Sequence, residues 1–79
     1  MRGGGLIMKW NVVIWLRNYK HIELKYLQSI QFVDELGELN TITEFSDFRK
    51  CDYKYVFTSN DGSFSINGSD IRYLDFIKS

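Results

Sequence analysis

The sequence contains no proline and no alanine, and it has one cysteine and one histidine. With a single cysteine, these residues form no internal disulfide, which suits a reducing compartment such as the cytosol. The absence of alanine removes the strongest helix former, whereas the abundant isoleucine, phenylalanine and tyrosine favour strands. The missing residues have GC-rich codons. We therefore predict a mostly β, cytoplasmic protein from a low-GC bacterial or phage genome.

Long apolar runs are also missing. The longest, residues 12–16, is far shorter than the about 20 residues of a transmembrane helix, so we predict no membrane association. Residues 1–8 include three consecutive glycines, and we predict that they form a flexible lead-in or cloning remnant. The remaining chain, residues 9–79, has the length of one small domain.

The polar stretch at residues 59–70, SNDGSFSINGSD, raises the question of a metal-binding loop. An EF-hand loop needs glycine at its sixth position and a bidentate acid at its twelfth. Counted from Asp61, these positions hold Ile66 and Arg72. Two turns flanking a short strand explain the stretch better, although an irregular site formed by Asp61, Asn67 and Asp70 is the alternative. Because Asp-Gly is a strong hairpin signal, we predict positive φ at Gly62.

Residue types for other chemistry are scarce. Cys51 and His21 are too few for a structural zinc site, and no orienting group accompanies them as a nucleophilic pair. The glycines at positions 3–5 precede a strand pattern instead of the helix that a phosphate loop requires. A chain of this length also has little room for both a core and a buried cleft. We therefore predict no enzyme activity, no metal and no cofactor.

The order of apolar residues predicts antiparallel strands. Trp10, Val12, Ile14 and Leu16 alternate with more polar positions, and a second alternation covers residues 53–58. A short strand is expected near residues 39–45, after a turn centred on Gly37. The sequence of residues 21–35 favours one long strand or two strands bent near residues 27–29. A helix is the competing interpretation, but it would leave Leu24 and Phe32 on its polar side.

We predict a small antiparallel barrel or roll of five to six strands, SH3-like or OB-like, because closing the sheet removes open edges. The last residues, 69–79, fit neither a strand nor a helix period cleanly, so a short C-terminal helix is an alternative to a final strand.

Charge is unevenly distributed although the formal net charge is zero. Residues 1–26 carry five basic residues and one acidic residue, whereas residues 27–47 carry five acidic residues and no basic one. Segregation of this kind steers charged partners or favours self-association, unless the charges pair across strands. The candidate binding residues are aromatic or basic: Arg17, Tyr19, Lys20, Tyr53 and Tyr55.

These features predict a non-catalytic protein-interaction domain, because aromatic surfaces with a few arginines anchor protein interfaces and sheet edges accept added strands. Its size and composition are typical of a phage or mobile-element accessory protein or inhibitor that binds a host protein or forms a homodimer. The alternative is a nucleic-acid-binding barrel, in which exposed rings stack on single-stranded bases. The balanced net charge weighs against the alternative.

Overall fold

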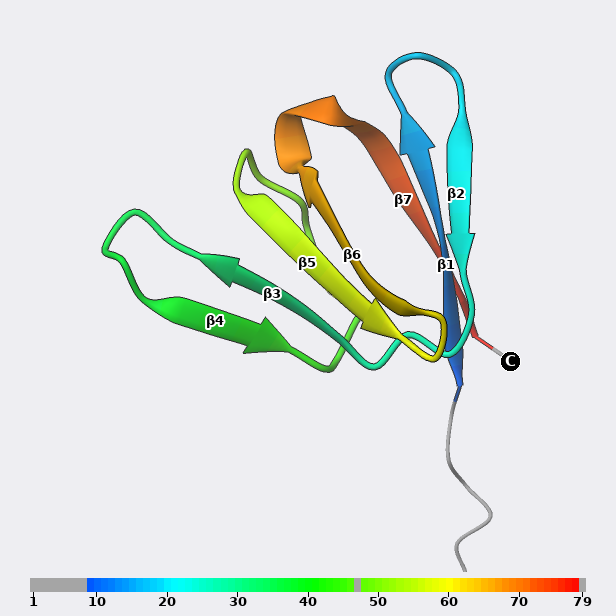
Figure 1. Cartoon of the computed structure of the whole chain (residues 1–79), viewed down its shortest axis with the longest axis horizontal. Helices are drawn as coiled ribbons and strands as arrows, with labels where there is room; N and C mark the ends of the chain where they lie inside the picture. Colours follow the sequence, from blue (N-terminus) through cyan, green and yellow to red (C-terminus); the bar gives the residue numbers. More distant parts are fainter. Residues whose placement is uncertain (1–8, 47, 79) are drawn as a thin grey trace, which may run out of the picture.

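The computed structural model describes residues 9–46 and 48–78, which form seven antiparallel strands in two sheets (Figure 1). This part of the chain contains no α-helix, and hence no helix long and apolar enough to cross a membrane. The strands are β1 (Trp10–Leu16), β2 (His21–Leu24), β3 (Ser29–Val33), β4 (Leu39–Ile42), β5 (Lys54–Ser59), β6 (Gly62–Asn67) and β7 (Ile71–Lys78), with a 3₁₀ turn, η1 (Gly68–Asp70), before β7.

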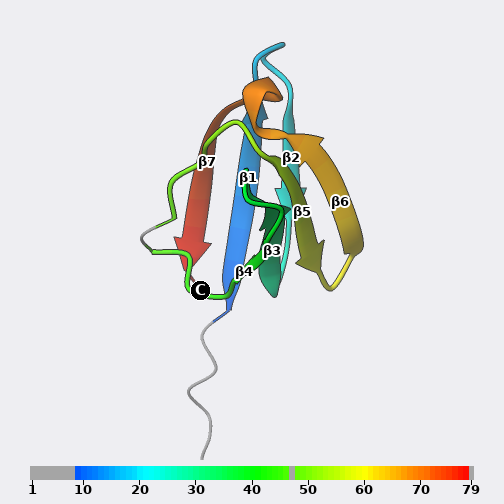
Figure 2. The ribbon, with the colours of Figure 1, turned by 90° about the vertical axis from the view of Figure 1, so that its left-hand side faces the viewer.

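The first sheet has the order β2-β1-β7 and the second has the order β4-β3-β5-β6. Figure 2 shows the two sheets from the side. Both sheets contribute residues to one hydrophobic core. Its buried residues are Val12, Ile14, Leu24, Leu27, Ile30, Phe45, Tyr55, Phe57 and Ile71. The period-two pattern of β1 is confirmed, because Val12 and Ile14 are fully buried while their neighbours are not.

Residues 21–35 form two strands with a bend, so the competing helix interpretation is wrong. At the bend Tyr26 adopts a φ of 59°. The Leu27 N–H then donates to the Trp10 carbonyl of the first sheet, and the Gln28 N–H donates to the Thr58 carbonyl of the second, at 2.7 Å each. The chain therefore crosses between the sheets at this point, with its backbone groups paired on both sides.

Two parts of the predicted fold need correction. The described residues contain seven strands instead of five or six, and their strands do not close into a barrel. After β6 the chain turns through η1 into the other sheet, so β6 pairs only with β5 and β7 only with β1 among these residues. The predicted mostly β, antiparallel fold is confirmed, but among the described residues two open sheets replace the closed barrel.

The predicted alternative of a C-terminal helix is also wrong, since residues 71–78 form β7. The register between β1 and β7 shifts at the start of β7, where Leu16 pairs with Ile71 and Trp15 with Tyr73. Arg72 is the extra residue of this bulge, which reverses the parity of the strand. Ile71 therefore shares the inner side with Leu74 and Phe76, which explains why no single period fits the sequence.

The predicted positive φ at Gly62 is confirmed, with a value of 115°. Gly62 pairs with Ser59 across the β5–β6 hairpin, so the two turn residues are Asn60 and Asp61. The Ser59 hydroxyl accepts the Asp61 N–H at 3.1 Å and so supports the turn.

We expect Gly62→Val to lower the free energy of unfolding by about 1 to 3 kcal/mol, because a β-branched residue is strained at this φ. A Cβ at Gly62 would meet no atom within 4 Å, so the expected loss comes from the backbone alone. Urea denaturation measures it. Ser65→Val, at an exposed position of the same strand, is the control and should leave stability within about 0.5 kcal/mol of the wild type. Equal stability of the two variants would contradict the strain argument.

The predicted turn at Gly37 is confirmed, with a φ of 79°. The Asp34 carboxylate accepts the Asn40 side-chain N–H and the backbone N–H groups of Glu38 and Leu36. These hydrogen bonds hold the pKa of Asp34 below its usual value, led by the bond from Asn40. The carboxylate thereby organises the β3–β4 hairpin.

Candidate functional site

The connection between β4 and β5 lies alongside β7 (Figure 2). We call its described residues, 43–46 and 48–53, the cover segment. Although irregular, it contributes Phe45, which is 2% exposed. The Phe45 ring stacks on Phe76 with centroids 5.7 Å apart and meets Trp10 edge to face at 6.2 Å. Phe48 contacts Phe76 and Tyr55 in edge-to-face geometry at 5.9 and 5.5 Å. These contacts pack the cover segment against the open side of the core.

Two hydrogen bonds from backbone N–H groups anchor the end of the cover segment. The Cys51 N–H donates to the Tyr55 hydroxyl, and the Gly68 N–H donates to the Tyr53 carbonyl, both at 2.7 Å. A Cβ built on Gly68 would lie 2.0 Å from the Cys51 carbonyl oxygen. Only glycine therefore permits this close approach of η1 to the cover segment.

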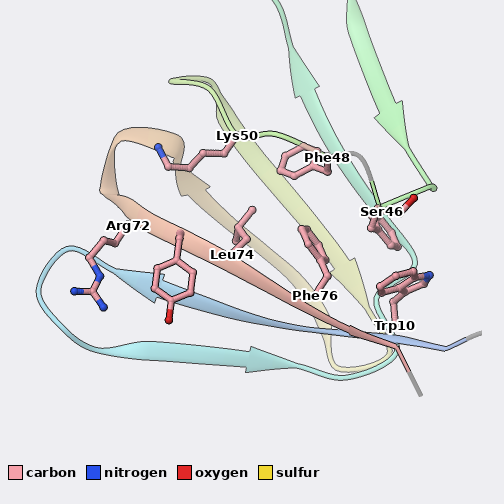
Figure 3. Close-up of a pocket in the computed structure, with 9 residues that line it drawn as sticks. Trp10, Ser46, Phe48, Lys50, Arg72, Leu74 and Phe76 are labelled. Atoms are coloured by element: carbon pink, nitrogen blue, oxygen red, sulfur yellow. The ribbon is translucent and has the colours of Figure 1, made fainter.

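A groove of about 510 Å³ lies between the cover segment and β7 (Figure 3). Leu74, Phe76 and Phe48 occupy its middle, Trp10 and Ser46 lie toward one end, and Lys50 and Arg72 lie toward the other. The complete lining is Trp10, Phe45, Ser46, Phe48, Lys50, Arg72, Tyr73, Leu74 and Phe76. Its two charged members are both basic.

The free edge of β7 faces this groove. The Leu16 N–H donates to the Lys20 carbonyl, and the Trp10 carbonyl accepts from the Leu27 N–H. Both partners lie on the β2 side of β1, so the even-numbered residues of β1 direct their backbone N–H and C=O groups toward β2. In an antiparallel ladder the odd-numbered residues then face β7, where Val13 pairs with Asp75. By the same alternation, Leu74 and Phe76 direct their N–H and C=O groups away from β1. Within residues 9–46 and 48–78 no second strand pairs with this edge of β7, so apolar side chains and an open strand edge lie together at the groove.

Three of the predicted binding residues, Arg17, Tyr19 and Lys20, gather at the turn between β1 and β2. Tyr19 is 79% exposed and has a φ of 68°. The guanidinium of Arg72 lies 5.3 Å from the centroid of its ring. The Arg17 Nε–H donates to the Ser69 carbonyl at 2.7 Å, which ties this turn to η1.

The other two predicted residues lie apart, Tyr53 directly before β5 and Tyr55 within it. Tyr55 is 1% exposed and belongs to the core, where its hydroxyl accepts the Cys51 N–H. Tyr53 is half-buried, stacks on Phe32 at 4.8 Å and donates its hydroxyl to Glu35. The bond to Glu35 raises the pKa of Tyr53 to about 12. Both residues support the fold, and the structure does not bring them to the Arg17–Lys20 turn.

A row of rings on the outer face of the first sheet was not predicted. Trp15 lies between His21, at 4.8 Å, and Tyr73, at 5.9 Å, and the guanidinium of Arg72 covers the Tyr73 ring at 5.5 Å. With Tyr19 beyond Arg72, these groups form a continuous stack. Most ring faces in it are already occupied by a neighbour, which leaves few faces for a ligand to stack on.

Charged side chains remain segregated in the fold. Residues 9–25 and 68–78, which include the first sheet, hold six basic and three acidic residues, whereas residues 26–46 and 48–67 hold three basic and six acidic ones. Basic groups lie over rings, as Lys78 does over Trp10 at 5.5 Å. Acidic side chains instead accept hydrogen bonds from uncharged donors, as Glu44 does from the Ser46 hydroxyl at 2.9 Å.

Within residues 9–46 and 48–78, no three His, Cys, Asp or Glu side chains lie close enough to hold a metal ion. No family model matches the chain, and neither a curated protein nor a solved structure matches it. The groove beside β7 is thus a candidate site on an open antiparallel β fold of two sheets.

Proposed function

We propose that this chain is a non-catalytic protein-interaction domain that binds an extended segment of a partner protein along the free edge of β7. The observation that carries the proposal is the coincidence of that edge with the groove beneath the cover segment. In strand addition, backbone hydrogen bonds supply affinity and side-chain pockets supply specificity. The groove offers both, from Leu74 and Phe76.

The groove suits a peptide in size and in composition. Its volume of about 510 Å³ falls in the range of ligand sites, about 300 to 1,000 Å³. Aromatic rings and an arginine, which anchor many protein interfaces, make up most of its lining. The bulge at Arg72 and the lysine at position 78 limit a new strand to the central part of β7.

The proposal predicts that Leu74→Pro abolishes binding of an extended peptide. Proline removes the Leu74 N–H, which faces away from β1, and so deletes a hydrogen bond to the partner while leaving the β1–β7 ladder intact. Leu74→Val is the matched control, since it keeps the N–H and an apolar side chain. Phage display of random decapeptides on the wild type supplies the ligand, and isothermal titration measures its affinity for each folded variant.

Retained affinity in a folded Leu74→Pro variant would contradict strand addition at this edge. If Leu74→Pro does not fold, the same titration is made on Phe48→Ser, which removes a groove ring that is half-buried and lies outside the sheets. We expect that variant to weaken binding at least about tenfold, because interface anchors contribute more than about 1.4 kcal/mol each.

Binding of single-stranded nucleic acid is the second candidate function. The exposed ring of Tyr19, with the Arg72 guanidinium 5.3 Å from its centroid and with Arg17 and Lys20 in the same turn, is the observation that favours it. Retention on single-stranded DNA that falls with salt, and that is lost in Tyr19→Ala, would support this candidate over the peptide. A phage or mobile-element origin, an inhibitory role and a cytoplasmic location stay predictions from the sequence.

A further inference from the structure

We infer that the partner segment carries a basic residue opposite Asp75, on the outward side of the bound strand, between two apolar residues that face the groove. This inference rests on the proposed function and adds to it the chemistry of the partner segment. It holds for a bound strand of either direction, because side chains alternate between the two faces of a sheet whichever way the strand runs.

The alternation along β7 determines where each partner side chain points. Leu74 and Phe76 pack against the core and extend on the side of Phe48 (Figure 3), whereas Asp75 is exposed on the outer face, where it pairs with Val13. Residues directly opposite each other in a sheet have their side chains on the same face. Partner residues opposite Leu74 and Phe76 therefore face the groove, and the residue opposite Asp75 faces outward.

The Asp75 carboxylate is available to a partner. Among residues 9–46 and 48–78, no hydrogen bond or ion pair joins it to another side chain or to the backbone. The Arg72 guanidinium of the same strand instead lies over the rings of Tyr73 and Tyr19. A base opposite Asp75 would gain a cross-strand ion pair, whereas an acid at that position would be repelled.

The surroundings of Asp75 suit a long basic side chain. Tyr73 and Ile77 flank Asp75 on the outer face of β7 and are 47% and 43% exposed. The methylene groups of an arginine or lysine can cover such apolar surface while the charged end reaches the carboxylate. Arginine fits best, because its planar guanidinium can donate to both carboxylate oxygens at once.

A second copy of this chain does not supply that base. Two β7 strands related by a twofold axis keep matching faces only if odd-numbered residues pair with odd-numbered ones. An axis at Leu74 places Asp75 opposite Tyr73 of the other copy. An axis at Asp75 places the two aspartates opposite each other, and an axis at Phe76 places Asp75 opposite Ile77. The carboxylate meets no base in these central registers, so we commit to a different chain as the occupant.

Three peptides that differ at one position test the inference: acetyl-TVTVRVTVT-amide, acetyl-TVTVQVTVT-amide and acetyl-TVTVEVTVT-amide. Each has the same residue order in both directions, and its central residue lies between two valines for the groove. We expect the arginine peptide to bind the wild type about fivefold more tightly than the glutamate peptide, with the glutamine peptide between them. The difference should shrink as salt rises from about 0.05 M to about 0.5 M. Isothermal titration measures the affinities.

Variants assign the preference to one carboxylate. Asp75→Lys should reverse the order of the arginine and glutamate peptides. The matched control is Glu23→Lys, which changes the net charge equally at an exposed residue of the same face, on the far side of Val13. That control should keep the wild-type order. If Asp75→Lys does not fold, Asp75→Asn replaces it and should abolish the difference.

The outcomes separate the inference from the proposed function. Equal affinity of the three peptides for the wild type, or an unchanged order in the Asp75 variants, would overturn the inference and leave strand addition standing, which Leu74→Pro tests. If none of the three peptides binds, the inference fails. The proposed function then fails with it, unless phage display has supplied a ligand whose binding Leu74→Pro abolishes.

Discussion

Replacing Gly68 by alanine is expected to lower the free energy of unfolding by about 3 kcal/mol, which corresponds to a fall in Tm of about 12 to 24 °C for a domain of this size. The added methyl group would lie 2.0 Å from the Cys51 carbonyl oxygen and 3.0 Å from both the Tyr53 carbonyl oxygen and the Tyr55 ring. Two of these three neighbours are backbone atoms, so no side-chain rotation relieves the clash. Either η1 or the cover segment must move.

That movement has a predictable structural consequence. Displacing η1 lengthens the 2.7 Å bond from the Gly68 N–H to the Tyr53 carbonyl, and displacing Cys51 breaks its bond to the Tyr55 hydroxyl. Both bonds hold the cover segment in place. Ser69→Ala is the control, because Ser69 is exposed and its carbonyl, which accepts from Arg17, is unchanged by the substitution. Thermal melts followed by circular dichroism compare the variants, and equal Tm values would contradict the close approach described here.

Phe45→Ala is expected to lower the free energy of unfolding by about 3 kcal/mol, because a buried phenylalanine leaves a cavity that its neighbours fill only in part. Phe45 is 2% exposed and contacts both Phe76 and Trp10, so its loss affects the groove as well as the core. Peptide affinity should therefore fall together with stability. Chemical denaturation measures the first effect and titration of a bound peptide measures the second.

Leu39→Ala is the matched control for Phe45→Ala. Leu39 is 65% exposed on β4, in the second sheet, and does not line the groove beside β7. We expect a loss of no more than about 0.5 kcal/mol and an unchanged affinity. If Phe45→Ala behaves like this control, the cover segment is not part of the core, and the groove lacks a fixed wall.

Local patterns predict the parts of the fold that depend on neighbouring residues. The alternation in β1 predicts its buried face, and Asp61-Gly62 predicts the hairpin and the positive φ that the structure has. Barrel closure depends instead on how η1 redirects the chain after β6, which no period in the sequence encodes. The bulge at Arg72 likewise prevents a prediction of β7 from its alternation, because one extra residue moves the inward-facing positions from odd to even numbers.

The candidate site is less accessible to prediction because its parts come from three distant regions of the chain. Tyr19 stands out in the sequence through its basic neighbours, and the structure places it on the surface. The groove joins Trp10, the cover segment and β7, which only the tertiary fold brings together. One signal was present nevertheless: Phe45 and Phe48 are aromatic residues within the mostly polar stretch of residues 43–52, and such rings are expected to pack on the core.

The central claim is that the free edge of β7 accepts a strand, and amide hydrogen exchange by NMR tests it most directly. In the free protein the Leu74 and Phe76 amides should exchange quickly, while the Asp75 amide, which faces β1, should exchange slowly. Saturation with a bound peptide should slow exchange at Leu74 and Phe76 and leave Asp75 unchanged. Binding of a peptide without added protection at Leu74 and Phe76 would contradict the account.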